Sequence, residues 1–156
     1  NKASLKNSLQ AKRFLEALSA VLLEQGRSNL LILIQDSNEL RSTGGFLTEA
    51  MVLSFENGSL IDRQAYSIDE LGDRVYGNRA APEEIKRVLS EEVYYLRDAN
   101  WEGDFALASA DIAWFFEQSL GQKIDFFVAL NSKTILELLD VWGGVDLQGG
   151  LIGLII

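Results

Sequence analysis

Apolar and polar residues alternate with periods that predict helices and strands along most of the chain. Over residues 2–24 apolar residues recur every three or four positions, as on one face of a helix. The continuous apolar run 30–34 is typical of a strand that is buried on both faces. Residues 46–55 and 59–66 predict two strands, and Asn57 and Gly58 between them are a strong hairpin signal. The predicted sheet therefore contains an antiparallel pair.

The second half of the chain alternates predicted helices and strands. Pro82, followed by two glutamates, predicts a helix that runs to about Tyr95, after an irregular polar stretch over 69–78. Its inward-facing residues are expected to be Ile85, Val88, Leu89 and Val93. Further along the chain we predict a helix over 105–120, a strand over 124–130, a helix over 132–142 and another strand over 145–147.

These elements predict a single α/β (α+β) domain over residues 1–156, with a mixed sheet flanked by helices. No apolar run reaches the roughly 18 residues that a membrane-spanning helix requires. The chain begins inside a helical pattern and without a methionine. We therefore expect it to be a piece of a larger protein, and a membrane anchor upstream of Asn1 would lie outside this chain.

Composition excludes several kinds of chemistry. The chain has neither cysteine nor histidine, which excludes disulfides, thiolate nucleophiles, Cys/His zinc sites and imidazole bases. Its formal net charge is −9, so its long-range field repels nucleic acid and anionic lipid. No nucleic-acid partner is expected, and an anionic ligand requires a local cluster of Arg or Lys.

Two polar loops hold the candidate chemistry. The first, residues 36–45, follows the buried strand, where ligands of open α/β sheets tend to lie. Its glycines, Gly44 and Gly45, let backbone N–H groups approach an anion, and Arg41 can pair with a phosphate. Asp36 offers oxygen to a cation such as Mg²⁺. The alternative is an ordinary turn, in which these residue types serve backbone geometry.

The second loop, residues 96–104, places an arginine and several carboxylates beside a tryptophan. Arg97 can face a phosphate, while Asp98 and Asp104 can face a metal ion or accept a proton. Trp101 is then a wall of the same site, or it only pins the loop to the core. Arginines among carboxylates are also typical of simple surface ion pairs.

The stretch 121–146 resembles a signature of the LytR-CpsA-Psr family. In that signature a strand of the form G-x-x-I-D-x-x-V-x-x-N leads into a helix that ends in G-G-V. The positions are taken here by Gly121, Ile124, Asp125, Val128 and Asn131, and by the sequence Gly-Gly-Val at 143–145. Upstream, the apolar strand, the arginine-containing loop and the hairpin follow the layout of the same family.

Both polar loops are similar to motifs of a second family, an uncharacterised group of bacterial envelope proteins. Those motifs are N-E-L-R-x-T-G-G-F, which is found here at 38–46, and L-R-D-A-N-W, which is found at 96–101. This second family looks distantly related to the first. Together the two resemblances span most of the chain, and they imply a LytR-CpsA-Psr-like fold.

The resemblance implies a function in the cell envelope. LytR-CpsA-Psr proteins are membrane-anchored with an extracytoplasmic domain, and they transfer glycopolymers from a polyprenyl diphosphate carrier to peptidoglycan with Mg²⁺. Arginines bind the diphosphate and aspartates bind the metal ion in that family. By this resemblance Arg41 matches an arginine that opens the hairpin strand. That arginine is usually followed by an acid in R-x-D-T, and Thr43 occupies the place of the acid here.

The expected site follows from the loops and the resemblance together. The expected catalytic residues are Arg41, Arg97 and Asp98; the substrate-binding residues are Asn38, Thr43, Gly44, Gly45, Asn100 and Trp101; and the metal ligands for Mg²⁺ are Asp36 and Asp104. One hypothesis is a phosphotransferase that acts on glycans linked to polyprenyl diphosphate. The alternative is a non-catalytic module that binds an envelope glycan, polyprenyl lipid or protein, which the threonine at position 43 favours. A third reading is a structural domain whose two loops only brace each other.

Overall fold

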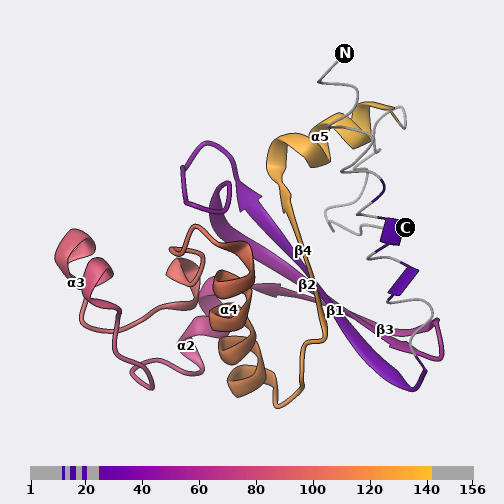
Figure 1. The fold of residues 1–156 in the computed structure, drawn as a ribbon, viewed down its shortest axis with the longest axis horizontal. Helices are drawn as coiled ribbons and strands as arrows, with labels where there is room; N and C mark the ends of the chain where they lie inside the picture. Colours follow the sequence, from indigo (N-terminus) through magenta and orange to yellow (C-terminus); the bar gives the residue numbers. More distant parts are fainter. Residues whose placement is uncertain (1–11, 13–14, 17–18, 21–24, 142–156) are drawn as a thin grey trace, which may run out of the picture.

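The computed structural model describes residues 12, 15–16, 19–20 and 25–141 of the chain. Four strands form one sheet in the order β3-β2-β1-β4 (Figure 1). Their bounds are β1 Arg27–Asp36, β2 Phe46–Glu56, β3 Ser59–Ser67 and β4 Phe126–Asn131. β2 pairs antiparallel with both β1 and β3, whereas β4 lies parallel to β1. The predicted mixed sheet with an antiparallel hairpin is thus confirmed, and the fold is α+β.

β1 is one of the two inner strands, and its side chains pack on both faces of the sheet. Leu31 and Leu33 are fully buried and belong to the main hydrophobic core. Leu30 and Ile32 point to the opposite face, where Leu30 packs in a smaller cluster with Phe55. This arrangement explains why the strand is a continuous apolar run rather than an alternating one.

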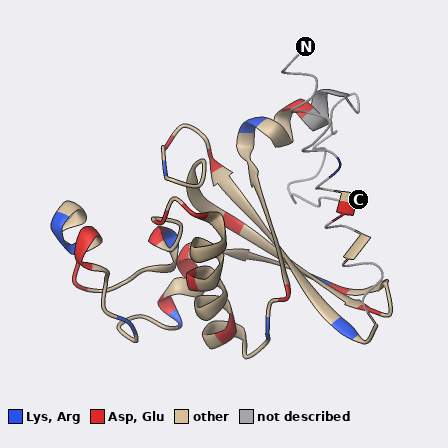
Figure 2. Cartoon of the chain, viewed as in Figure 1, with Lys and Arg blue, Asp and Glu red and all other residues tan. Residues whose placement is uncertain are grey.

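Helices fill the chain between β3 and β4, and one more follows β4. They are α2 Ile68–Asp73, α3 Glu83–Leu89, the 3₁₀ helix η1 Leu96–Asp98, α4 Phe105–Leu120 and α5 Ser132–Val141. The main core is formed by α2, η1, α4 and Ile85 of α3, together with the sheet face of Leu31 and Leu33. α3 lies away from the sheet in Figure 1. It carries acids in its first turn and bases in its last turn, as the helix dipole favours (Figure 2).

Several boundaries differ from the predictions. α3 ends at Leu89 instead of near Tyr95, because Ser90 adopts a left-handed conformation with φ 58° and closes the last turn. Val88, predicted to face inward, is 58% exposed. The stretch 69–78, predicted as irregular, begins with α2, whose Ile68 and Leu71 are buried. β4 begins at Phe126, after the buried Ile124 has joined the core.

Two predicted elements lie largely or wholly outside the described residues. Of the helix predicted over 2–24, only residues 12, 15–16 and 19–20 are described, and these are helical. The predicted break at Gly143 and Gly144 and the strand after it are not among the described residues. A search of the described part of the chain finds no helix with the length and apolar character needed to span a bilayer.

Candidate functional site

The first polar loop joins β1 to β2 and is shaped by local hydrogen bonds. The Asp36 carboxylate accepts from the backbone and side-chain nitrogens of Asn38, at 2.9 and 3.0 Å, which is an Asx turn. Backbone bonds from Gly44 N to the Arg41 carbonyl and from Phe46 N to the Glu39 carbonyl complete the loop. Asp36 therefore has a structural partner of its own, and Asn38 is exposed.

The two glycines of this loop are required by its backbone. Gly44 has φ +125°, a conformation that other residues rarely adopt. At Gly45 an added Cβ would lie 2.4 Å from the backbone oxygen of Asp36, which cannot move aside cheaply. The geometry accounts for both glycines without a bound anion, which is what the ordinary-turn interpretation expected.

A buried chain of amides connects the first loop to the second. Gln35, at the end of β1, and Asn100 each donate a side-chain N–H to the Thr43 hydroxyl oxygen, at 2.7 and 3.0 Å. Asn100 also donates to the Gly45 carbonyl at 2.7 Å, and its side chain is fully buried. Thr43, which stands where the resembled family has an acid, is therefore occupied with holding the two loops together.

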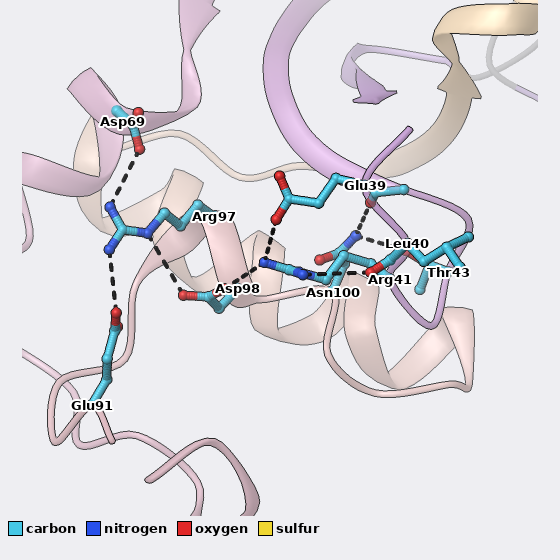
Figure 3. Close-up of polar contacts among 10 residues, drawn as sticks. Glu39, Leu40, Arg41, Thr43, Asp69, Glu91, Arg97, Asp98 and Asn100 are labelled. Atoms are coloured by element: carbon cyan, nitrogen blue, oxygen red, sulfur yellow. Dashed lines mark hydrogen bonds and ion pairs between the residues drawn. The ribbon is translucent and has the colours of Figure 1, made fainter. Parts of the chain in front are cut away.

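The two loop arginines converge on one buried carboxylate (Figure 3). Asp98 lies in η1, and its side chain is only 4% exposed. Its Oδ1 lies 3.6 Å from Arg41 NH2, and its Oδ2 lies 3.7 Å from Arg97 Nε. We call this group the Arg41–Asp98–Arg97 cluster. The two motifs, more than fifty positions apart in the chain, thus meet as expected.

Aromatic rings and further acids surround the Arg41–Asp98–Arg97 cluster. The Arg41 guanidinium lies 4.9 Å from the centre of the Phe46 ring, and that of Arg97 lies 4.3 Å from the Tyr95 ring. Arg41 pairs with Glu39 at 3.0 Å. Arg97 pairs with Glu91 at 3.5 Å and Asp69 at 3.8 Å, which come from the segment before η1 and from α2.

Burial raises the pKa of the Asp98 carboxyl above its ordinary value, and the neighbouring Glu91 raises it further. Arg41 and Arg97 each pull that pKa down less strongly than burial raises it, and the net pKa is raised. Three buried polar atoms near the cluster have no hydrogen-bond partner, namely Arg41 Nε, Glu91 Oε2 and Asn100 Oδ1. The cluster is therefore incompletely satisfied.

Each of the two predicted metal ligands accepts hydrogen bonds from backbone N–H groups. Asp104 is the N-cap of α4 and accepts from the backbone N–H groups of Ala106 and Leu107, at 2.8 and 3.4 Å. Asp36 is used by its Asx turn. Within the described part of the chain there is no group of three or more carboxylates able to hold a metal ion. These donors do not fit a protein-built Mg²⁺ cage.

Trp101 packs against the main core and is half-buried, which agrees with the interpretation that it pins the second loop.

Sequence reasoning overlooked Gln35 and Glu91. Gln35 had a usable signal, because it is the polar residue that ends an apolar strand run. Glu91 had none, because glutamates on a predicted helix are usually solvated.

Comparison with known proteins identifies a family but no function. No curated protein matches the chain. A family model described as a protein of unknown function, DUF4012, matches residues 25–153, which include both polar loops and all four strands. The chain therefore belongs to the DUF4012 family.

Proposed function

We propose that this domain binds an anionic, phosphate-bearing ligand of the cell envelope at the Arg41–Asp98–Arg97 cluster. The observation that carries the proposal is the convergence of both motif arginines on one carboxylate. Arginine is suited to this role because its planar guanidinium donates two parallel hydrogen bonds to carboxylates and phosphates.

The spacing of the cluster leaves donor capacity for a ligand. Charge-assisted hydrogen bonds usually measure about 2.7–2.9 Å. The contacts of Asp98 with the two arginines are 3.6 and 3.7 Å, so neither is a close hydrogen bond. The side chains of Arg41 and Arg97 remain 17% and 36% exposed, which supports access from solvent.

The class of ligand follows from the sequence resemblance. We propose a polyprenyl diphosphate that carries a glycan, bound by a LytR-CpsA-Psr-like domain outside the cytoplasmic membrane, with the membrane anchor beyond this chain. Binding without transfer is the better supported form of this proposal. Thr43, at the place of the family's acid, is held by Gln35 and Asn100, and the metal ligands expected at Asp36 and Asp104 have structural partners.

Pyrophosphate is a direct probe for this proposal. We expect titration with pyrophosphate to shift the side-chain NMR resonances of Arg41 and Arg97. Substituting Arg41→Gln or Arg97→Gln removes a charged donor worth about 1.5–3 kcal/mol, so the Kd should rise about 10- to 100-fold. Arg87→Gln, at an exposed arginine on α3, is the matched control and should leave the Kd unchanged.

A titration in which both loop arginines are replaced without weakening pyrophosphate binding would rule out this site. Repeating the measurement with magnesium chloride and with EDTA tests the Mg²⁺ prediction. Binding that needs no magnesium indicates that the arginines alone hold the phosphates.

Transfer of the glycan is the second candidate function. It is favoured by Asp98, because a carboxyl with a raised pKa beside two arginines is suited to accept a proton from an attacking hydroxyl. Release of polyprenyl phosphate from a glycan-loaded carrier, in the presence of magnesium, is the measurement. If transfer occurs, Asp98→Asn should abolish it while pyrophosphate still binds.

A further inference from the structure

We propose that Asp98 is an internal competitor of the ligand: its carboxylate occupies the anion position between Arg41 and Arg97, and an external oxyanion takes that position when Asp98 accepts a proton. This inference rests on the proposed binding function and adds a form of regulation to the same site. Under this proposal, binding of an anion is coupled to the uptake of a proton by Asp98.

The geometry places Asp98 where a ligand would bind. Each of its two oxygens faces a different arginine, one from each polar loop. A phosphate or sulfate between the same two guanidinium groups would use its oxygens in the same way. The side chain is only 4% exposed, so the carboxylate lies inside the site rather than on the surface.

The charges around Asp98 make displacement without a proton costly. The first loop contributes Glu39 and Arg41 to the surroundings of Asp98, and the segment before η1 contributes Glu91 and Tyr94. Arg97 precedes Asp98 in η1, and it also pairs with Glu91 and with Asp69 of α2. The ion pairs thus gather four carboxylates around two guanidinium groups. If all four carboxylates are ionised, these six groups have a net charge of −2, which repels an entering dianion and disfavours its binding.

Protonation of Asp98 changes this balance in two ways. It removes one negative charge from the cluster, and it weakens the ion pairs that hold the two guanidinium groups toward the carboxylate. Burial, Glu91 and Glu39 all favour the neutral acid, which is why the pKa of Asp98 is raised. The proton comes from solvent and stays on the carboxyl, so no other group needs to change its charge.

Sulfate is the probe that isolates this effect, because it keeps both negative charges throughout the pH range used. We expect its affinity for the wild-type domain to increase as the pH falls from about 7.5 to about 5, by at most tenfold per pH unit for one linked proton. Asp98→Asn should bind sulfate about tenfold or more tightly at neutral pH and lose most of the pH dependence. Asp73→Asn, at an exposed carboxyl on α2, should behave like the wild type.

The outcomes separate this inference from the function on which it rests. If wild-type affinity does not change with pH and Asp98→Asn binds no more tightly, Asp98 is no competitor, while anion binding itself stands. If neither protein binds sulfate or pyrophosphate at any pH, the proposed function fails and the inference fails with it.

A measurement on the unmodified domain covers the case in which Asp98→Asn does not fold, which circular dichroism will show. Calorimetry of sulfate binding in two buffers with different ionisation enthalpies counts the protons taken up. We expect a net uptake that approaches one proton per sulfate near neutral pH. An uptake of zero would contradict the inference.

Discussion

Asn100 shows how much of the polar motif chemistry serves the fold. Its amide nitrogen donates to Thr43 and to the Gly45 carbonyl, so one side chain fixes two positions of the other loop. Gly45 is held at the same junction, against the backbone of Asp36. The motif residues that lie nearest the core are thus structural, whereas Arg41 and Arg97 keep exposed surface.

Gly45→Ala tests the tightness of this junction. The new Cβ would lie 2.4 Å from the Asp36 carbonyl oxygen, a backbone atom that the sheet holds in place. We expect the free energy of unfolding to fall by about 2 kcal/mol or more, as measured by urea denaturation. Gly103→Ala is the control, because its Cβ would meet no atom within 4 Å; it should be neutral or slightly stabilising. Equal effects at both glycines would show that the junction is loose.

At the scale of elements, some boundaries were predicted well. α4 runs from Phe105 to Leu120, as predicted, and in the structure Asp104 caps its start and Gly121 ends it. α3 was predicted six residues too long, since the apolar spacing continues through Val93 while Ser90 turns the backbone out of the helix. Serine in a left-handed conformation leaves no clear sequence signal.

Asp104→Ala distinguishes a helix cap from a metal ligand. Loss of the two hydrogen bonds to the start of α4 should lower the free energy of unfolding by about 1 kcal/mol. Asp104→Ser, which keeps a capping oxygen, should restore most of that stability. If Asp104 were a metal ligand, the serine variant would instead lose magnesium affinity, and isothermal titration with magnesium would detect it.

For the site, sequence reasoning identified the arginines and Asp98 as neighbours in one site, but not the ion pairs of Asp98 with both arginines. Two polar loops with one arginine each indicated a shared cluster, and the structure brings them together. Magnesium binding by Asp36 and Asp104 stays a prediction, because an aspartate at a turn or helix start looks the same in sequence whether it binds a cation or a backbone N–H, and here both accept from backbone N–H groups. Only the three-dimensional partners decide between the two.

At the scale of the whole molecule, charge and burial act together on stability. The chain has a formal net charge of −9, and Asp98 adds a carboxyl whose pKa is raised in the fold. A raised pKa means that the folded state binds more protons than the unfolded state between the two pKa values. The free energy of unfolding should therefore decrease as the pH rises through that interval.

Comparison of the wild type with Asp98→Asn isolates this contribution. Their difference in unfolding free energy, measured by urea denaturation from about pH 4 to about pH 7, should move in favour of the wild type as the pH falls through the raised pKa of Asp98. Asp73→Asn is the reference for general charge effects. A difference that stays constant with pH would mean that Asp98 titrates as an ordinary exposed acid.

The bond from Asn100 to Thr43 joins positions that are separated by 57 residues. The two loops should therefore open to solvent in one concerted event, with amide protons on both exchanging at a common rate. The two motifs also depend on each other for their shape. If the first polar loop is grafted into another scaffold, it needs an asparagine placed as Asn100 is here to keep its conformation.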